Sequence, residues 1–126
     1  MKKTGGRMAY VDGFVIPIPA GKIKAYQKIA AAAGKIWMHH GALGYMECVM
    51  EDENNKFGRS FKDAAATKKG ETVLFSYIVY KSRSHRDSVN KKVMADKRMK
   101  EDFEGVEMPF DMKRMVYGGF KSIVEF

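Results

Sequence analysis

The sequence predicts an α+β fold of the ferredoxin-like type, in which the elements follow the order βαββαβ and the strands form one antiparallel sheet. Four segments have the apolar density of strands, and two longer segments repeat apolar residues at the three- and four-residue spacing of helices. The strand segments are apolar on both faces, whereas two helices can cover only one face of a four-stranded sheet. A second copy of the chain is the expected cover for the other face, so we predict a homodimer joined sheet to sheet.

The first half of the chain reads as strand, helix, strand. A strand is expected at residues 10–16 (YVDGFVI), and it should end at Pro17 because proline cannot donate a ladder hydrogen bond. A helix is expected over residues 20–40, where the apolar residues form one inward stripe, and Gly41 is its natural stop. The second strand is expected at residues 44–50 (GYMECVM).

A polar segment separates the second strand from the third. Residues 51–70 are rich in turn formers, with room for a short strand near 57–61 and a helical turn at 61–66. Loops of this kind often shape the opening of a binding site. The third strand follows at 72–80 (TVLFSYIVY), which is the most strongly β-prone piece of the chain.

The last third of the chain reads as helix, loop, strand. A second helix is expected at 84–95, where Ser84 and Asp87 have the spacing of a capping box. Beyond this range the helical character fades. The loop 105–111 then leads into the last strand, which is expected within residues 114–124 (RMVYGGFKSIV).

The length and composition predict one domain. The chain has 126 residues, of which 45% are hydrophobic, and residues 8–126 are expected to form a single ferredoxin-like domain. Met8 resembles a second start, so residues 1–7 are expected to be a flexible extension or a cloning remnant. No apolar run approaches the ~20 residues that span a bilayer. The single cysteine, Cys48, excludes an internal disulfide and predicts a cytoplasmic location.

The net charge of +8 is concentrated in two places. Residues 1–7 hold three cations, and residues 81–100 hold eight Lys and Arg against two Asp. A solvated outer face is the favoured interpretation of the basic helix at 84–95. Nucleic-acid binding through this helix is the less favoured alternative, because residues 81–100 contain no aromatic side chain on which bases could stack.

Four motifs carry a family resemblance: YVDGFVIPIP, W-x-x-H-G-A-L-x-Y-x-E-C (37–48), FSYIVYKSRSHRD and MPFDMKRMVYGGF. Together they resemble the YbaA-like family of uncharacterised bacterial proteins, a domain of unknown function placed in the dimeric α/β-barrel superfamily. The resemblance covers nearly everything from Met8 onward. It implies a ferredoxin-like fold whose sheets pair back to back in a dimer. It implies no established activity, because the wider superfamily includes cofactor-free monooxygenases, haem-degrading enzymes and ligand-binding proteins.

The sequence predicts neither a metal site nor a cofactor. His39 and His40 are adjacent, and adjacent helix positions point about 100° apart, so the two side chains cannot hold one ion together. Cys48 alternates with Met46 and Met50 along its strand. This pattern favours a buried core position over a nucleophile with His40 as its base.

Two carboxylates interrupt otherwise apolar strands. Glu47 shares a strand face with Tyr45 and Val49, and Asp12 lies in the first strand. A bare carboxylate on such a face would be destabilising, which leaves two interpretations. One is an ion pair that stabilises the dimer, and the other is a general base or ligand anchor in a cleft. The candidate cationic partners are Arg59, Arg83, Arg86 and Arg114.

A small-molecule pocket between the sheet and the helices is the function that we favour from the sequence, with catalysis left open. The glycine pair 118–119 predicts a bulge, tight packing beneath Trp37, or a ligand against bare backbone. The alternative function is a structural or regulatory dimer without catalysis. The expected pocket residues are Asp12, His40, Tyr45, Glu47, Tyr77, Tyr117, Gly118 and Gly119.

Overall fold

A computed structural model describes residues 8–53 and 56–126 of the chain. The strands are β1 (Tyr10–Pro19), β2 (Gly44–Val49), β3 (Glu71–Tyr80) and β4 (Val116–Lys121). The helices are α1 (Ile23–His39), α2 (Phe61–Ala64), α3 (Arg83–Ala95) and α4 (Lys97–Phe103), with short 3₁₀ turns η1 (Ala20–Lys22) and η2 (Met112–Arg114). The expectation for residues 1–7 lies outside the described residues.

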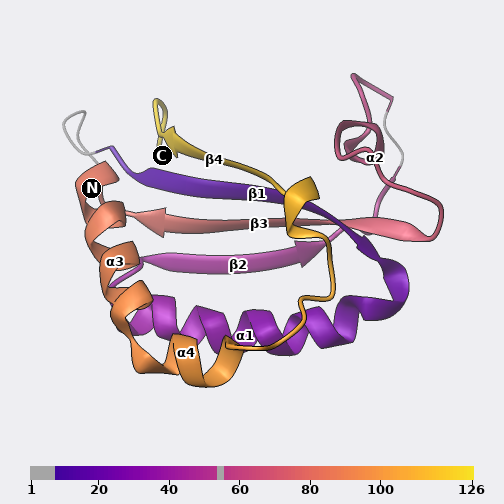
Figure 1. The fold of residues 1–126 in the computed structure, drawn as a ribbon. Helices are drawn as coiled ribbons and strands as arrows, with labels where there is room; N and C mark the ends of the chain where they lie inside the picture. Colours follow the sequence, from indigo (N-terminus) through magenta and orange to yellow (C-terminus); the bar gives the residue numbers. More distant parts are fainter. Residues whose placement is uncertain (1–7, 54–55) are drawn as a thin grey trace.

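The four strands form one sheet in the order β2-β3-β1-β4, and each adjacent pair is antiparallel. β3 therefore lies between β1 and β2, which α1 connects across one face of the sheet (Figure 1). The α+β architecture with a four-stranded antiparallel sheet is confirmed. Among the described helices, none is long and apolar enough to cross a membrane.

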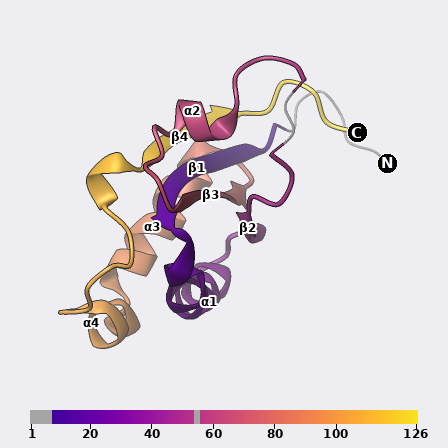
Figure 2. The same cartoon turned by 90° about the vertical axis from the view of Figure 1, so that its right-hand side faces the viewer.

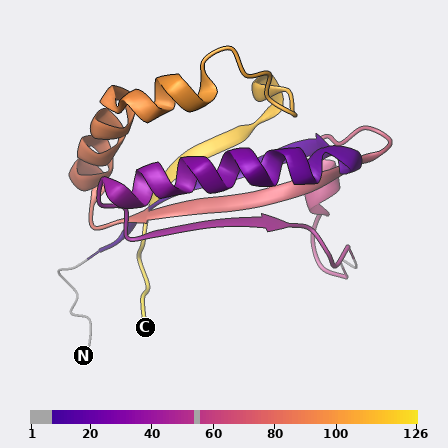
Figure 3. The same cartoon turned by 90° about the horizontal axis from the view of Figure 1, so that it is seen from below.

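The core lies between one face of the sheet and the helices. α1 and α4 lie below the sheet in Figures 1 and 2, and Figure 3 shows α1 running along the strands with α3 and α4 beside it. Alternate residues of the strands point to this side because side chains alternate along a strand. The buried apolar residues shared by the sheet and the helices include Ile16, Ile18, Tyr26, Ala30, Ile36, Leu74, Ile78, Tyr80, Val89 and Val93.

The other face of the sheet is apolar and largely uncovered in the described chain. Phe75 of β3 lies opposite Val15 of β1 and Cys48 of β2 in the register, and Val15 lies opposite Val116 of β4. We call this the open face. α2 and residues 122–126 lie on its side of the sheet, near opposite ends of the strands (Figure 1). Cys48 is half-buried on this face and not in the core, because β2 points its even-numbered residues away from α1.

β1 is longer than expected and continues through two prolines. Pro17 and Pro19 pair with residues of β3, whereas β4 pairs with β1 only as far as Val15. The prolines thus lie where β1 has a neighbour on one side only, and a missing N–H is tolerated at such an edge. The expected end at Pro17 was wrong for this reason.

The helix boundaries differ from expectation where capping residues act. α3 begins at Arg83, because the Ser82 hydroxyl accepts a hydrogen bond from the His85 N–H at 3.1 Å and Ser82, not Ser84, is the N-cap. Helical structure resumes after Asp96, whose carboxylate accepts a hydrogen bond from the Arg98 N–H at 2.8 Å and so caps α4. In the segment after β2, the helical turn α2 forms and the strand considered near 57–61 does not.

Candidate functional site

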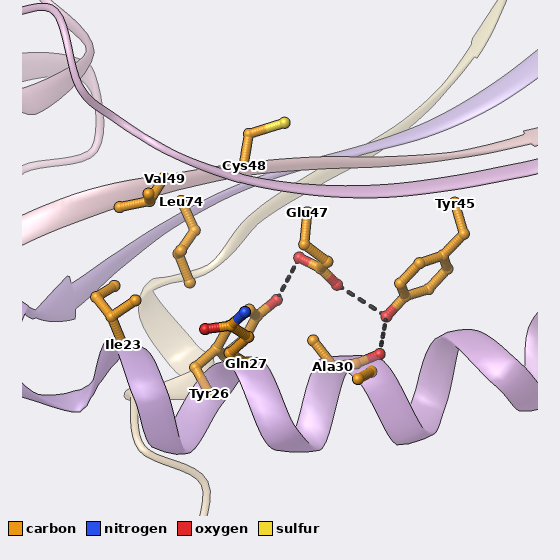
Figure 4. Close-up of a pocket in the computed structure, with 10 residues that line it drawn as sticks. Ile23, Tyr26, Gln27, Ala30, Tyr45, Glu47, Cys48, Val49 and Leu74 are labelled. Atoms are coloured by element: carbon orange, nitrogen blue, oxygen red, sulfur yellow. Dashed lines mark hydrogen bonds between the residues drawn. The ribbon is translucent and has the colours of Figure 1, made fainter.

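Glu47 is the polar centre of the interior between α1 and the sheet. The Tyr26 hydroxyl donates to Glu47 Oε1 at 2.7 Å, and the Tyr45 hydroxyl lies 2.8 Å from Oε2 (Figure 4). Tyr45 and Glu47 are two residues apart on β2, so both point toward α1. The Tyr45 hydroxyl also lies 3.0 Å from the carbonyl oxygen of Ala30, one turn beyond Tyr26 on α1. One strand and one helix therefore hold a single carboxylate between two phenols.

Gly34 lets the ring of Tyr45 lie directly against α1. A Cβ atom at Gly34 would lie 2.7 Å from Tyr45 Cε1, closer than two carbon atoms can pack without strain. Glycine weakens a helix interior, so its presence here is explained by the close approach of the ring. The helix and the tyrosine are thus fitted to one another.

Both phenols act as hydrogen-bond donors to Glu47. Burial is the main cause that raises the pKa of Tyr26 above its ordinary value, and the hydrogen bond and charge of Glu47 raise it further. Burial, and then the charge of Glu47, likewise raise the pKa of Tyr45. The two hydroxyls keep their protons at neutral pH, so they stabilise the carboxylate without neutralising it.

Two cavities flank this carboxylate. The first, of about 280 Å³, lies between α1 and the edge strand β2, and it opens to solvent because Gln27 and Ala31 of its wall are exposed. The second, of about 240 Å³, lies between α1, the sheet and residues 108–115. The residues that line both cavities are Tyr26, Ala30, Tyr45 and Glu47.

The walls of the two cavities are mainly apolar. Phe14, Trp37 and Phe110 contribute aromatic rings to the second cavity, and Met108 and Met115 contribute thioethers. Among the described residues that line either cavity, Glu47 is the only one with a formal charge. The site therefore consists of two mainly apolar cavities with one negatively charged group between them.

Asp12 belongs to a separate cluster at the start of α3. It is 2% exposed, and Arg86 Nη1 donates to its Oδ1 at 2.6 Å and to the Tyr117 hydroxyl at 3.0 Å. The Arg86 guanidinium also lies 5.0 Å from the ring centroid of Tyr10. Burial raises the pKa of Asp12, and the charge of Arg86 opposes this effect. The cluster ties α3 to β1 and β4 through a buried ion pair.

His40 belongs to a third cluster, which joins α1 to α4. Its Nε2 lies 2.7 Å from Asp96 Oδ2, and Arg98 Nη2 donates to the same oxygen at 2.6 Å. Hydrogen bonds from Arg98, and then from His40, hold the pKa of Asp96 well below its usual range. Because Arg86 and Arg98 are both used in such pairs, part of the basic segment serves the fold.

Of the remaining expected residues, Tyr77 lines the second cavity with Glu47, and the glycine pair 118–119 lines neither cavity. Tyr77 points to the open face, where its hydroxyl lies 3.2 Å from Met46 Sδ, although it contributes to the wall of the second cavity. β4 pairs with β1 residue by residue, so the glycine pair forms regular strand. A side chain at Gly119 would collide with Tyr10, and one at Gly118 would contact Phe120. The close approach of Tyr10, and not Trp37, explains Gly119, whereas the contact at Gly118 is an ordinary van der Waals contact that a side chain could make.

The four arginines that were candidate partners for Glu47 and Asp12 also lie at different places in the structure. Arg86 pairs with Asp12, and Arg114 donates to both carboxylate oxygens of Glu71 at 2.7 and 2.8 Å. Arg59 lines a depression beside α2, and Arg83 lines one at the start of α3. Over the described ranges 8–53 and 56–126, Glu47 forms no ion pair with any Lys, Arg or His.

Comparison with known proteins places the chain in a family. The family model described as "Protein of unknown function (DUF1428)" matches residues 9–112. The chain belongs to this family. The Uncharacterized protein YbaA of Escherichia coli (strain K12) is 46% identical over 118 residues, which are 94% of this chain and 99% of that one. The protein of the same name from Shigella flexneri has the same identity and coverage.

Among solved structures, the chain is similar to the De novo designed protein Foldit4, at 11% identity and a TM-score of 0.42. The match covers 93% of this chain and 99% of that one. A similarity at this level carries no argument about the fold or the site. The family resemblance seen in the four sequence motifs is confirmed by the DUF1428 match.

Two parts of the site in this DUF1428 chain were not anticipated from the sequence. Tyr26 counted only as one apolar position of the helix stripe, yet a buried phenol needs a hydrogen-bond partner, and Glu47 is the acceptor. Residues 108–115 were expected as loop and strand, and they form a wall of the second cavity. Among the residues that the structure describes, no group of three His, Cys, Asp or Glu could hold a metal ion.

Proposed function

We propose that this member of the DUF1428 family binds a small organic molecule between α1 and the sheet, with Glu47 as its polar anchor. The observation that carries the proposal is that cavities of about 280 and 240 Å³ meet at one carboxylate, which two tyrosines orient. Small-molecule sites usually have mostly apolar walls with a few well-placed polar groups. The two cavities share this composition.

The chemistry available at the site is anchoring of a ligand and acceptance of a proton. Glu47 is the group that can act as a general base, because the neighbouring phenols keep their protons and can only donate. Tyr26 and Tyr45 restrict the carboxylate to one orientation, which is what a binding or catalytic group requires. Binding is the function that we propose, and any reaction would add proton transfer through Glu47.

A cavity-filling series on α1 tests the proposal. Ala33 lines the second cavity, Ala31 lines the first, and Ala25 is exposed and lines neither. Each is replaced by leucine, so the three variants carry the same change in the same helix. Ligand-observed NMR with a panel of small aromatic fragments is the measurement.

Fragments that bind the wild type should also bind Ala25→Leu, and they should bind Ala33→Leu or Ala31→Leu at least about tenfold more weakly. Binding that is equal in all three variants would place the ligand elsewhere and overturn the proposal. Circular dichroism of each variant checks that the loss does not reflect unfolding.

We also propose that the chain has a ferredoxin-like fold that pairs through its open face into a dimeric α/β barrel in the cytoplasm. The support is the continuous apolar surface of the open face, on which Met46, Phe75 and Phe120 are exposed. Large exposed apolar patches mark interaction surfaces, and one copy of the face can pack against another around a twofold axis. Native mass spectrometry is the test, and a monomer would contradict this proposal. A dimer without any ligand would favour the structural function over the binding function.

A further inference from the structure

We infer that the ligand of the Glu47 site is an organic cation, in which a protonated amine is attached to an aromatic or aliphatic body. This inference rests on the proposed function and names the class of molecule that the site would take. Three features of the site support it: the charge of Glu47, its hydrogen-bond capacity, and the aromatic walls beside it.

The first feature is that Glu47, a half-buried carboxylate, has different partners from three well-covered carboxylates of the described chain. The side chains of Asp12, Glu71 and Asp96 are at most 10% exposed, and each pairs with an arginine at 2.6 or 2.7 Å. Within residues 8–53 and 56–126, Glu47 pairs instead with two neutral phenols. A charge that is partly removed from water is stabilised by an opposite charge. The positive partner that the other carboxylates obtain from the chain is what a ligand would bring to Glu47.

The second feature is the hydrogen-bond capacity that remains on Glu47. A carboxylate has about four acceptor positions on its two oxygens. Tyr26 supplies one proton, while the single hydroxyl proton of Tyr45 is shared between Glu47 Oε2 and the Ala30 carbonyl oxygen. At least two acceptor positions on the Glu47 carboxylate are therefore not used by the two phenols. A protonated amine has up to three N–H donors and matches this surplus of acceptors.

The third feature is the wall of the second cavity beside the carboxylate. The rings of Trp37, Tyr26 and Phe110 line it, and the latter two meet edge to face with centroids 5.7 Å apart. Aromatic faces attract cations, and a cation out of water gains more from them. The thioethers of Met108 and Met115 can adjust to an irregular apolar body. The cavity thus offers a place for the body of the ligand next to the place for its charge.

These features also exclude the opposite class of ligand. Because the described lining residues include one negative charge and no positive charge, an anionic ligand would meet electrostatic repulsion with no compensating cation. A neutral ligand would fill the cavity but leave Glu47 without a countercharge. The expected order of affinity is cation, then neutral molecule, then anion.

Three probes with one phenylethyl skeleton test this order on the full chain: 2-phenylethylamine, 2-phenylethanol and 3-phenylpropanoate. Affinity is measured at pH 7 by ligand-observed NMR titration. We expect the amine to bind at least about tenfold more tightly than the alcohol, and the carboxylate to bind more weakly than both. Equal affinity for the amine and the alcohol, lost in Ala33→Leu, would overturn the cation inference and leave the proposed pocket standing.

A charge-matched pair of variants then assigns the preference to Glu47. Glu47→Gln keeps the shape of the side chain and removes its charge, whereas Glu104→Gln removes the same charge from an exposed position on the surface. Glu47→Gln should reduce the affinity for the amine to that for the alcohol, and Glu104→Gln should leave both unchanged. An amine preference that survives in a folded Glu47→Gln variant would overturn the inference. If Glu47→Gln does not fold, the three probes are measured on the wild type and on Tyr26→Phe, because both retain the carboxylate. A preference for the amine in both proteins supports the inference, and equal affinity for the amine and the alcohol overturns it.

Binding of none of the probes at about 1 mM would count against the proposed pocket itself as well as against the cation inference. The two failures are thus distinguished by the alcohol, which needs only the cavity, and the amine, which also needs the charge.

Discussion

The contact between Gly34 and Tyr45 predicts whether Gly34→Ala raises or lowers the stability of the protein. In most helix interiors, replacing glycine by alanine stabilises the protein by about 0.5–1 kcal/mol. In α1, the new Cβ would lie 2.7 Å from Tyr45 Cε1 and 2.8 Å from Cδ1. The ring is not free to move aside, because its hydroxyl is held by Glu47 and the Ala30 carbonyl oxygen.

The expected magnitude follows from these opposing effects. Overpacking of a fitted contact costs about 1–3 kcal/mol, which exceeds the gain in helix propensity. Gly34→Ala should therefore lower the free energy of unfolding by about 1 kcal/mol, and the melting temperature by a few degrees. It should also weaken binding at the Glu47 site, since Tyr45 must shift away from the carboxylate.

Urea denaturation of four proteins measures the effect: wild type, Gly34→Ala, Tyr45→Ala and the double variant. Without the Tyr45 ring, Gly34→Ala should become stabilising by up to about 1 kcal/mol, so the sign of the substitution reverses. Gly21→Ala is the control, because a Cβ at that position meets nothing within 4 Å. A stabilising Gly34→Ala in the presence of Tyr45, or the same effect in both backgrounds, would refute the reasoning.

Three further predictions concern charge and assembly. Hydrogen bonding from Arg114 lowers the pKa of Glu71 from 4.5 to about 2, so the stability from this pair is present above pH 4.5 and is lost as the pH falls toward 2. In a Glu71→Gln variant, the free energy of unfolding should fall less over that interval, and an unchanged pH profile would contradict this. Asp12→Ala removes the buried carboxylate partner of Arg86, which keeps its salt bridge to Asp87, and should lower the free energy of unfolding by about 1–3 kcal/mol in urea, whereas replacing both Asp12 and Arg86 by apolar residues should cost less. Phe75→Asp on the open face should convert the proposed dimer to a monomer in native mass spectrometry, and a variant that stays dimeric would rule out this face as the interface.

Local signals in the sequence predicted most of the secondary structure. The helical spacing of apolar residues located α1, and the β-prone segment at 72–80 became β3 with one residue added. The extension of β1 through Pro17 was not predictable in this way. It depends on where β4 ends beside β1, which is decided by residues about a hundred positions away. α4 could have been found from Asp96 as a cap, a local signal that the charged composition of the segment obscured.

The candidate site was also predicted only in part, because local signals marked its residues but not their partners from distant parts of the chain. The alternation of a strand placed Tyr45 and Glu47 on one face, and the cost of a bare carboxylate marked Glu47 as unusual. The sequence grouped Asp12 and His40 with them, because all four residues are polar groups at element ends or in apolar strands. The structure separates them, since Asp12 meets Arg86 and His40 meets Asp96.

The sequence by itself determined the inward apolar stripe of α1, the apolar character of both faces of the strands, and the presence of a carboxylate among these apolar residues. These properties follow from the periodicity of each element, which neighbouring residues decide. Only the tertiary structure decided what Glu47 would meet. Its partner Tyr26 comes from another element, and the flanking cavities depend on how closely α1, the sheet and residues 108–115 approach one another. Such contacts join distant parts of the chain, so no local pattern can specify them.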